Sequence, residues 1–294
     1  MKNIIIYGAG HMGQLYLSHL DDDTKCVAFV DGDPVKQGKT YFGIPIIPPQ
    51  KIIGLEFDKV VICVNAHSVH SISFGWKYEE EMLQVLDELG IPEEKITLQC
   101  NRVESNIKPF KFVSELSEIM KNRNVPGAVA ECGVWRGHFA HHINKCFPER
   151  KLYLFDTFKG FDENDWGKDA DGEFGEYVIA NQDDYHFYRG SERAALLRCI
   201  HRNNVVIKKG YVPDTFAGLE NEHFAYVNLD MDLYAPQLAA LRFFGPRMSV
   251  GGVITVHDYT TLPGTNQAVT EFAEESGAVV LPVIEDSSVA IVMR

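Results

Sequence analysis

Acidic side chains stand at the carboxyl ends of four apolar segments that follow residue 125. They are Glu131, Asp156, Asp230 and the adjacent pair His257 and Asp258. Packing gives buried strands no reason to end on carboxylates, so this shared placement indicates function. If the four segments are parallel strands of one sheet, their ends line one crevice, where open α/β sheets bind ligands. Such an acidic crevice suits a cationic cofactor, a metal ion, or both.

A glycine-rich turn follows the first of these acids. Residues 127–137 read GAVAECGVWRG, an apolar run that reaches Glu131 and continues into a tight turn. Gly133 lets the backbone approach a ligand closely, and Gly137 opens a helix whose free N–H groups face the same crevice. A carboxylate beside such a turn suits hydroxyls, amines or a cation better than phosphate. An ordinary strand–turn–helix corner is the alternative for so short a motif.

Alternating strands and helices position these groups. From residue 127 onward, apolar runs of strand length alternate with helical periodicity, and a hairpin ends the chain. This order predicts an α/β domain with a doubly wound parallel sheet, to which the hairpin adds an antiparallel edge strand. The expected strands are 129–131, 152–156, 205–208, 225–230, 252–256, 278–283 and 288–293. The expected helices are 138–146, 191–202, 235–244 and 265–276.

A second glycine motif opens the chain. An apolar run leads into Gly8, Gly10 and Gly13 of a G-x-G-x-x-G motif, and a second strand ends at Asp31. Together these features form a dinucleotide-binding pattern, in which the turn seats a pyrophosphate and the acid accepts from a ribose hydroxyl. We therefore predict a small Rossmann-like nucleotide-binding domain, and residues 38–49 within it are turn-rich. The alternative is a relic unit kept for packing or dimerisation.

This first segment resembles the small nucleotide-binding domain at the start of sugar O-acyltransferases and related polysaccharide-biosynthesis proteins. The resemblance rests on the opening IIIYGAG, the strand end FVDGDP and the segment GIPI. Residues 101–109 are polar and lack periodicity, which is typical of a linker. We divide the chain into a nucleotide-binding domain at residues 1–105 and a second domain at residues 106–294.

Composition excludes several classes of partner. The chain has 294 residues, enough for two domains, and a net charge of −13, which repels the phosphates of nucleic acid. We expect no membrane contact, because no apolar run approaches the ~20 residues that span a bilayer. Six cysteines with mostly apolar neighbours and no C-x-x-C pair are typical of a reducing compartment. We therefore expect a cytoplasmic protein, and a homo-oligomer in the form of a dimer.

Residues 125–294 resemble the class I S-adenosylmethionine-dependent methyltransferases, specifically the macrocin O-methyltransferase (TylF/MycF-like) family, which methylates sugar hydroxyls. The matching stretches are AVAECGVWRG, LYLFDTFKGFDE, KKGYVPDTF, YVNLDMDLYAP, MSVGGVITVHDY and PGTNQAVTEF. The resemblance implies a seven-stranded class I methyltransferase fold and S-adenosyl-L-methionine as cofactor. The implied substrate is a small-molecule sugar or nucleotide sugar.

The resemblance also implies the site residues. Asp156 would accept from the ribose hydroxyls of the cofactor, and Gly210-Tyr211 would flank it after the third strand. The implied cofactor-binding residues are Glu131, Gly133, Gly137, Asp156, Thr157, Gly210, Tyr211 and Asp230. Family members bind Mg²⁺ through carboxylates of LD-x-D and D-D-Y motifs. Here these are Asp230, with Asp232 as a further candidate, and Asp258.

One departure from the family pattern concerns the metal. The pattern has two acids before a tyrosine, whereas this chain reads His257-Asp258-Tyr259. Imidazole is a poorer ligand for a hard ion such as Mg²⁺. The site can hold its ion with fewer carboxylates, prefer Mn²⁺, or work without metal, and His257 is then a candidate general base. A structural hydrogen bond at His257 is the remaining alternative. We take Asp230, His257 and Asp258 as the catalytic and metal-binding candidates.

The insertion after Asp156 is a candidate lid. Residues 157–190 carry nine acidic, three basic and eight aromatic side chains. Aromatic residues in such an insertion suit a lid that stacks on a sugar ring and excludes water. A solvated acidic loop whose aromatics pack on the sheet is the alternative.

The combined interpretation is an S-adenosylmethionine-dependent O-methyltransferase, assisted by a divalent cation such as Mg²⁺ or Mn²⁺. Its acceptor would be a hydroxyl of a sugar, nucleotide sugar or glycosylated small molecule. Two other functions stay open. One is an NAD-dependent oxidoreductase that uses the N-terminal glycine motif, although no lysine–tyrosine or zinc-ligand pairing typical of hydride chemistry stands out. The other is a non-catalytic nucleotide-sugar-binding protein.

Overall fold

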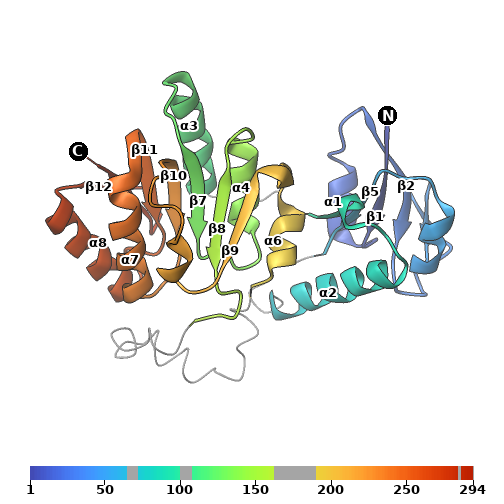
Figure 1. Cartoon of the computed structure of the whole chain (residues 1–294). Coiled ribbons are helices and arrows are strands. Elements are labelled where there is room, and N and C mark those ends of the chain that lie inside the picture. The colour runs from blue at the N-terminus through green and yellow to red at the C-terminus, as the bar shows by residue number, and fades with distance from the viewer. Residues whose placement is uncertain (65–71, 100–107, 162–189, 284–285, 294) are drawn as a thin grey trace. The chain divides into compact units, whose positions relative to one another are not determined.

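Two compact units, Met1–Asn101 and Arg102–Arg294, make up the chain. The computed structural model describes residues 1–64, 72–99, 108–161, 190–283 and 286–293 (Figure 1). The domain boundary predicted between residues 105 and 106 lies outside the described residues. Most of the predicted lid, residues 162–189, lies outside them as well.

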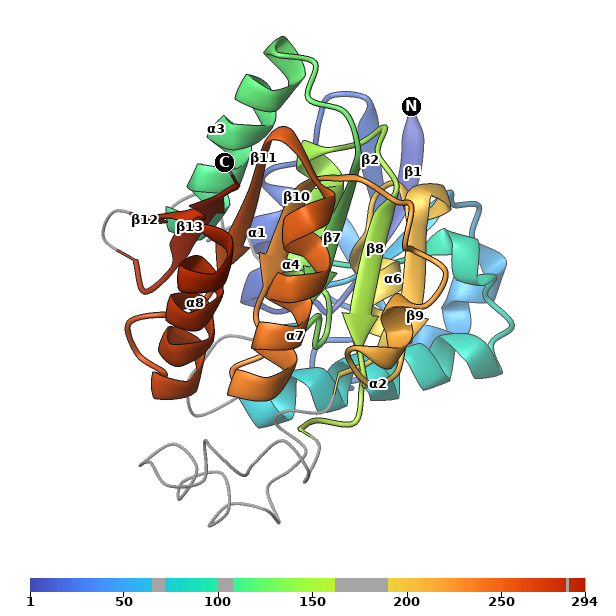
Figure 2. The ribbon, with the colours of Figure 1, turned by 60° about the vertical axis from the view of Figure 1, so that its left-hand side comes forward.

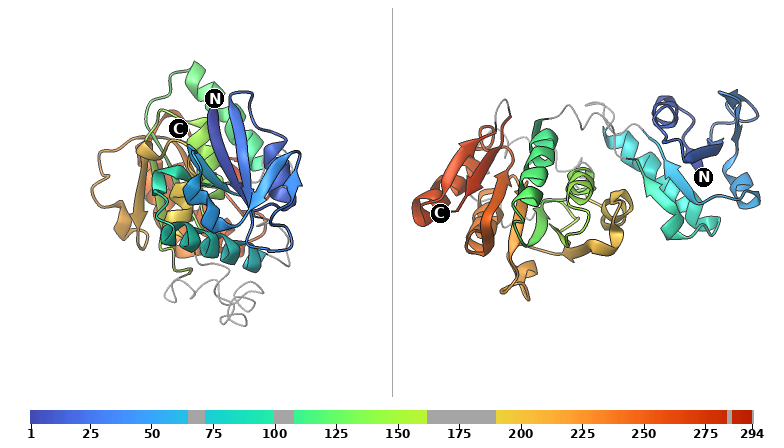
Figure 3. Two further views of the ribbon diagram at one scale, coloured as in Figure 1. Left: turned by 90° about the vertical axis from the view of Figure 1, so that its right-hand side faces the viewer. Right: turned by 90° about the horizontal axis from the view of Figure 1, so that it is seen from above.

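The N-terminal unit is built on a six-stranded sheet with the order β3-β4-β2-β1-β5-β6 (Figure 3, left). Its strands are β1 (Lys2–Tyr7), β2 (Thr24–Val30), β3 (Thr40–Tyr41), β4 (Ile44–Ile47), β5 (Lys59–Ile62) and β6 (Ile96–Leu98). Its α-helices are α1 (His11–Leu17) and α2 (Ile72–Glu88). All described pairings are parallel except that between β3 and β4.

The hairpin β3–β4 lies in the stretch that the sequence predicted to be turn-rich. Phe42 and Gly43 both have positive φ, 52° and 78°, as the two central residues of a tight hairpin turn require. Pro45 lies in β4. A proline and a glycine in this short stretch mask the strand pattern in the sequence, yet proline is tolerated near a sheet edge, where fewer N–H groups need partners.

The C-terminal unit contains a seven-stranded sheet with the order β12-β13-β11-β10-β7-β8-β9 (Figure 2). Its strands are β7 (Ala128–Cys132), β8 (Leu152–Asp156), β9 (Val205–Lys209), β10 (Phe224–Leu229), β11 (Met248–Val256), β12 (Val279–Pro282) and β13 (Val289–Val292). Its described α-helices are α3 (Lys108–Asn122), α4 (His138–Cys146), α6 (Glu192–Arg198), α7 (Tyr234–Phe244) and α8 (Pro263–Ser276). The doubly wound α/β fold predicted from the sequence is therefore present.

The terminal hairpin is placed differently from the prediction of an antiparallel edge strand. The antiparallel strand is β13, and it lies inside the sheet because it pairs with β11 on one side and with β12 on the other. The edge itself is β12. After α8 the chain first runs along the outer edge as β12, and it then turns back as β13 into the place between β12 and β11.

Alternating side chains of the strands feed two cores. On β7 and β10, Val129 and Tyr226 face the helices α3, α4 and α6, whereas Ala130 and Val227 face α7 and α8. This period of two is what a strand covered on both faces requires. Fully buried valines such as Val129 and Val227 each contribute about 1.5–3 kcal/mol on burial. The cores fix the strands, and the strands fix the crevice at their carboxyl ends. None of the described helices is long and apolar enough to cross a membrane.

Gly137 takes part in this packing, and its predicted cofactor role stays a prediction. It is the N-cap of α4 with φ 83°, and a Cβ there would lie 2.4 Å from Cα of Ala195 in α6. The residue therefore allows α4 and α6 to pack closely at the corner after β7.

We expect Gly137→Ala to destabilise the protein more than Gly218→Ala, which serves as its control. Gly218 has nearly the same φ, 84°, but no atom lies within 4 Å of the position that a Cβ would take there. The control should cost roughly 1–2 kcal/mol for the left-handed backbone alone. Gly137→Ala should cost a further ~1–3 kcal/mol for overpacking. Thermal melting of both variants checks this, and equal losses would contradict the packing role.

Candidate functional site

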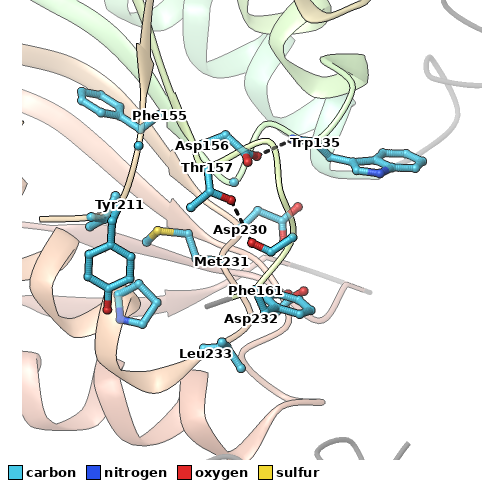
Figure 4. A pocket seen from close by; sticks show the side chains of 15 residues that line it. Trp135, Phe155, Asp156, Thr157, Phe161, Tyr211, Asp230, Met231, Asp232 and Leu233 are labelled. Carbon is cyan, nitrogen blue, oxygen red and sulfur yellow. Dashed lines mark hydrogen bonds between the residues drawn. The ribbon is translucent and has the colours of Figure 1, made fainter. Parts of the chain in front are cut away.

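A hollow of about 260 Å³ opens at the carboxyl ends of β7, β8, β9 and β10 (Figure 4). Predicted site residues on its wall are Gly133, Asp156, Thr157, Gly210, Tyr211 and Asp230, together with Asp232. The sequence prediction missed the apolar wall residues Trp135, Phe155, Met231 and Pro236, whereas Phe161, also on the wall, is one of the aromatic residues of the predicted lid segment. An apolar hollow with a few converging acids is the usual form of a cofactor site.

Asp156 organises the turn after β7. Its Oδ2 accepts hydrogen bonds from the backbone N–H groups of Val134 and Trp135, both at 2.7 Å. Its Oδ1 accepts from the N–H of Phe158 at 2.6 Å. Burial raises the pKa of Asp156 and these three donors lower it, with a net increase. Because a carboxylate accepts about four hydrogen bonds, one position is left for the ribose hydroxyl that the sequence predicted.

Two residues bound by Asp156 have strained backbones. Trp135 and Phe158 have φ values of 49° and 56°, in the left-handed region that residues other than glycine rarely adopt. Such strain persists only where surrounding contacts enforce it, and it gathers at functional sites. Here the Asp156 carboxylate supplies those contacts and holds the backbone of Trp135 at the wall of the hollow (Figure 4).

Because Gly133 has no side chain, the ends of β7 and β10 can lie close together. A Cβ at Gly133, whose φ is 84°, would lie 1.8 Å from the backbone oxygen of Asp230. The sequence predicted that this glycine admits a ligand. The structure shows that it first admits the neighbouring backbone, and that the resulting surface is part of the hollow.

A second hollow of about 210 Å³ lies between the start of α3, α4 and the ends of β7, β10 and β11. It shares Gly133, Trp135 and Asp230 with the first hollow. Its other wall residues are Pro109, Phe110, Glu131, Val134, His138, Phe139, Asn228 and His257. The two hollows therefore meet at Asp230.

Glu131 reaches the second hollow from inside β7, one residue before the strand ends. Its side chain is 1% exposed, and Oε2 has no hydrogen-bond partner among the residues that the structure describes. Burial raises the pKa of Glu131 well above its usual range, and the charges of Asp230 and Asp156 raise it further. Burial and the neighbouring carboxylates therefore favour the protonated form of Glu131, and its Oε2 lacks a partner among the described residues.

A row of hydrogen-bonded polar side chains crosses the sheet to Glu131. Asn228 on β10 is the register partner of both Glu131 on β7 and Thr255 on β11. Its side chain bonds the Glu131 carboxyl, while its Oδ1 accepts from the Thr255 hydroxyl at 2.8 Å. The Thr255 hydroxyl lies 2.7 Å from the hydroxyl of Tyr226. Two of these polar residues were detectable in the sequence, since Asn228 precedes Asp230 and Thr255 precedes His257 by one strand period.

Asp230, His257 and Asp258 come together as a cluster, because β10 and β11 are parallel neighbours. Nδ1 of His257 lies 2.9 Å from Oδ2 of Asp258 and 3.3 Å from Oδ1 of Asp230. One ligand atom from each residue falls within 4.8 Å of the others. The three side chains are 30–37% exposed, so a ligand can reach them.

Contacts within the cluster shift the pKa values of His257 and Asp258. Burial lowers the pKa of His257, but hydrogen bonds and charges of both carboxylates outweigh it and raise the value to about 11. The His257 hydrogen bond in turn lowers the pKa of Asp258. In this arrangement the imidazole is protonated at neutral pH. The predicted role of His257 as a general base therefore requires that the imidazole first lose its contacts with the carboxylates.

In the N-terminal unit, the Asp31 carboxylate accepts hydrogen bonds from other groups of the protein. Oδ2 of Asp31 accepts from the Ala9 N–H at 2.9 Å and from Nζ of Lys36 at 2.8 Å, and Oδ1 accepts from the Asp33 N–H at 2.9 Å. Asp31 thus ties the glycine turn to β2 and, like Asp156, keeps one of about four acceptor positions.

The glycines of this motif differ in the room around them. A Cβ at Gly8 would lie 2.3 Å from the Cys63 oxygen, and one at Gly13 would lie 2.0 Å from the Gly8 oxygen. Gly10 has no atom within 4 Å of that position. A nucleotide site at this turn stays a prediction, and Gly10 is the glycine of the three that has room for a ligand.

A family model described as macrocin-O-methyltransferase (TylF) matches residues 108–292. The chain belongs to the macrocin-O-methyltransferase family. Residues 1–97 match a second model, described as C2185-like, N-terminal. The resemblance of this segment to the domain of sugar O-acyltransferases stays a prediction.

Individual relatives agree with the family. The chain is similar to mycinamicin III 3''-O-methyltransferase of Micromonospora griseorubida, with 30% identity over 164 residues, 52% of this chain and 63% of the relative. It is similar to demethyldecarbamoylnovobiocin O-methyltransferase of Streptomyces niveus, with 28% identity over 184 residues, 56% of this chain and 65% of the relative. The chain thus spans slightly less than two thirds of the length of these two relatives.

The fold agrees as well. The solved structure of the O-methyltransferase NovP matches 64% of this chain and 80% of its own with a TM-score of 0.53 and 26% identity. Within this macrocin-O-methyltransferase family member, the two hollows and the acidic cluster all lie in the part of the chain that the family model covers.

We expect Glu131→Gln to make the unliganded protein more stable at pH 8 relative to pH 5, compared with wild type. A buried acid whose folded-state pKa is raised is favourable only while it is protonated. Stability therefore falls as pH rises above the unfolded pKa, about 4.3, and glutamine removes this loss. Urea unfolding at both pH values checks it. Glu115→Gln, at a carboxylate whose side chain is 66% exposed, is the control. A pH dependence unchanged by Glu131→Gln would contradict a neutral Glu131.

Proposed function

We propose that the C-terminal unit transfers the methyl group of S-adenosylmethionine to a hydroxyl of a sugar, nucleotide sugar or glycosylated small molecule. The observation that carries the proposal is the position of Asp230, which lines both hollows and joins the His257–Asp258 pair. Names of relatives support the acceptor class. One relative, from Streptomyces olivaceus, is named as a 4'-O-methyltransferase of a tetracenomycin that carries a dimethoxy-rhamnosyl group.

The two hollows fit the two ends of S-adenosylmethionine. We assign the adenosine end to the first hollow, where Trp135, Phe161 and Tyr211 offer aromatic surface and Asp156 keeps one acceptor position. We assign the amino-acid end to the second hollow, where Oε2 of Glu131 has no hydrogen-bond partner among the described residues. An ammonium group there would satisfy this oxygen and favour the ionised carboxylate. The shared wall at Gly133 and Asp230 then lies beside the sulfonium.

Asp230 is the residue best placed to orient the acceptor. Methyl transfer needs the oxygen near 3 Å from the methyl carbon, in line with the bond that breaks, and its proton removed. A carboxylate at the junction of the hollows can accept the hydrogen bond of the acceptor hydroxyl. The His257 imidazolium, which Asp258 contacts in turn, holds Oδ1 of Asp230 at 3.3 Å, so the orientation of the Asp230 carboxylate is set before the acceptor arrives.

We further propose that Asp230, His257 and Asp258 hold a divalent cation. Two carboxylates and one imidazole within 4.8 Å form a mixed oxygen and nitrogen set, which suits Mn²⁺ better than Mg²⁺. A cation bound there would lower the pKa of the acceptor hydroxyl. His257 must lose a proton to become a ligand, so affinity for the ion should increase with pH.

Ligand binding tests the proposed cofactor. S-adenosylhomocysteine should raise the melting temperature of the full chain, with about 2.7 kcal/mol of stabilisation at 100 times Kd. Glu131→Gln should reduce that shift, because a neutral amide cannot pair with the ammonium, whereas Glu115→Gln should not. A thermal-shift screen with NAD(P) and nucleotide sugars included checks it. Stabilisation by NAD alone would overturn the methyltransferase proposal in favour of an oxidoreductase.

Chelation tests the metal. EDTA should stop methyl transfer, Mn²⁺ should restore it better than Mg²⁺, and His257→Asp should stay active with its preference moved towards Mg²⁺. Asp230→Asn and Asp258→Asn should each lower kcat by roughly 10²-fold or more. Turnover assays with exchanged metals measure these effects. Full wild-type turnover in EDTA would exclude an essential ion. An active His257→Asn variant would then leave Asp230 as the remaining base candidate.

A further inference from the structure

Asp258 uses its two carboxylate oxygens for different purposes. Oδ1 accepts hydrogen bonds from the hydroxyl of Thr261 at 2.9 Å and from the hydroxyl of Ser287 at 3.2 Å. Oδ2 faces Nδ1 of His257 at 2.9 Å. The backbone of Asp258 has φ 53°, a conformation that residues other than glycine rarely adopt. One oxygen is thus anchored, and the other belongs to the cluster.

Ser287 reaches Asp258 because β13 runs antiparallel to β11. The last pair of that ladder is Val256 with Val289. Two residues farther along, each strand has left the ladder, and Asp258 and Ser287 face each other. The Thr260 N–H donates to the Ser287 carbonyl at 3.1 Å, a second link between the same segments. The hairpin β12–β13, beside β11 in Figure 2, therefore delivers a hydroxyl to the cluster.

Thr261 reaches the same oxygen from a different element. It lies in the turn between β11 and α8, which is closed by the Leu262 N–H donating to the Asp258 carbonyl at 2.9 Å. The two hydroxyl groups thus approach Oδ1 from separate segments. Rotation of the carboxylate about its Cβ–Cγ bond breaks both contacts at once. Neither residue lines either hollow, so neither is placed to touch a bound ligand.

We propose that Thr261 and Ser287 are positioning residues for methyl transfer, holding Oδ1 of Asp258 so that Oδ2 stays on His257 beside Asp230. The inference rests on the proposed function, because it names residues that prepare its catalytic cluster. It also gives the terminal hairpin a role beyond closing the sheet. Outer partners of this kind typically account for a 10–100-fold effect on activity.

Kinetics of the full chain test the proposal. Thr261→Ala with Ser287→Ala should lower kcat about 10–100-fold and leave the KM for S-adenosylmethionine within about twofold of wild type. The conservative variants Thr261→Ser and Ser287→Thr should keep near wild-type kcat, because each retains a hydroxyl. Thr270→Ala is the matched control, since its hydroxyl bonds the Asn266 carbonyl on the exposed face of α8. A double variant with wild-type kcat, or a loss no larger than that of the control, would overturn the proposal.

A crystal structure of the double variant gives a readout that is independent of turnover. The contact between Oδ2 of Asp258 and Nδ1 of His257 should be broken or split between two carboxylate orientations. If the contact stays at 2.9 Å with both hydroxyls removed, Thr261 and Ser287 do not position the carboxylate. If the wild type methylates no sugar acceptor, the proposed function fails, and the variant structure still decides this inference.

Discussion

The closeness of β7 and β10 at their carboxyl ends is the constraint on which the site depends. The Gly133 residue meets the Asp230 carbonyl so closely that any Cβ would overlap it, and the Asp230 N–H donates to the Cys132 carbonyl at 2.8 Å. This contact puts Asp230 at the wall that both hollows share. The turn beyond Gly133 then has to bend sharply, and the Asp156 carboxylate holds that bend through three backbone N–H groups. The wall that the two hollows share at Gly133 and Asp230 therefore depends on one backbone contact.

A second consequence is a polar row inside the sheet. Residues Glu131, Asn228 and Thr255 lie side by side on three neighbouring strands, where packing alone would favour apolar side chains. Burial of an unpartnered carboxyl oxygen is unfavourable, and it persists because the rest of the row satisfies its remaining groups. Oε2 of Glu131, at the end of this row that faces the second hollow, lacks a hydrogen-bond partner among the described residues. A ligand that donates a hydrogen bond to this oxygen would therefore stabilise the folded protein. If the cofactor ammonium binds there, as we propose, cofactor binding and fold stability are linked through Glu131.

The sequence was most informative where a residue's place follows from strand order. Asp156, Asp230 and His257 were placed at strand ends by apolar runs alone, and parallel pairing brought the last two together. It was less informative where a role depends on what lies across space. Gly137 packs on α6, and the contacts of Thr261 and Ser287 with Asp258 depend on the register of an antiparallel strand. Periodicity identifies a strand and its faces, but not its neighbours or its register.

Histidine at position 257 changes the charge balance of the cluster of Asp230, His257 and Asp258. Two carboxylates alone would repel each other and would need an external cation, whereas the His257 imidazolium supplies a positive charge between them. The same proton occupies the nitrogen that a metal ion would use, so ion and proton compete for one site. An aspartate at this position would remove the competition and strengthen the need for the ion. Histidine at position 257 thus holds the two carboxylates in place without an external cation.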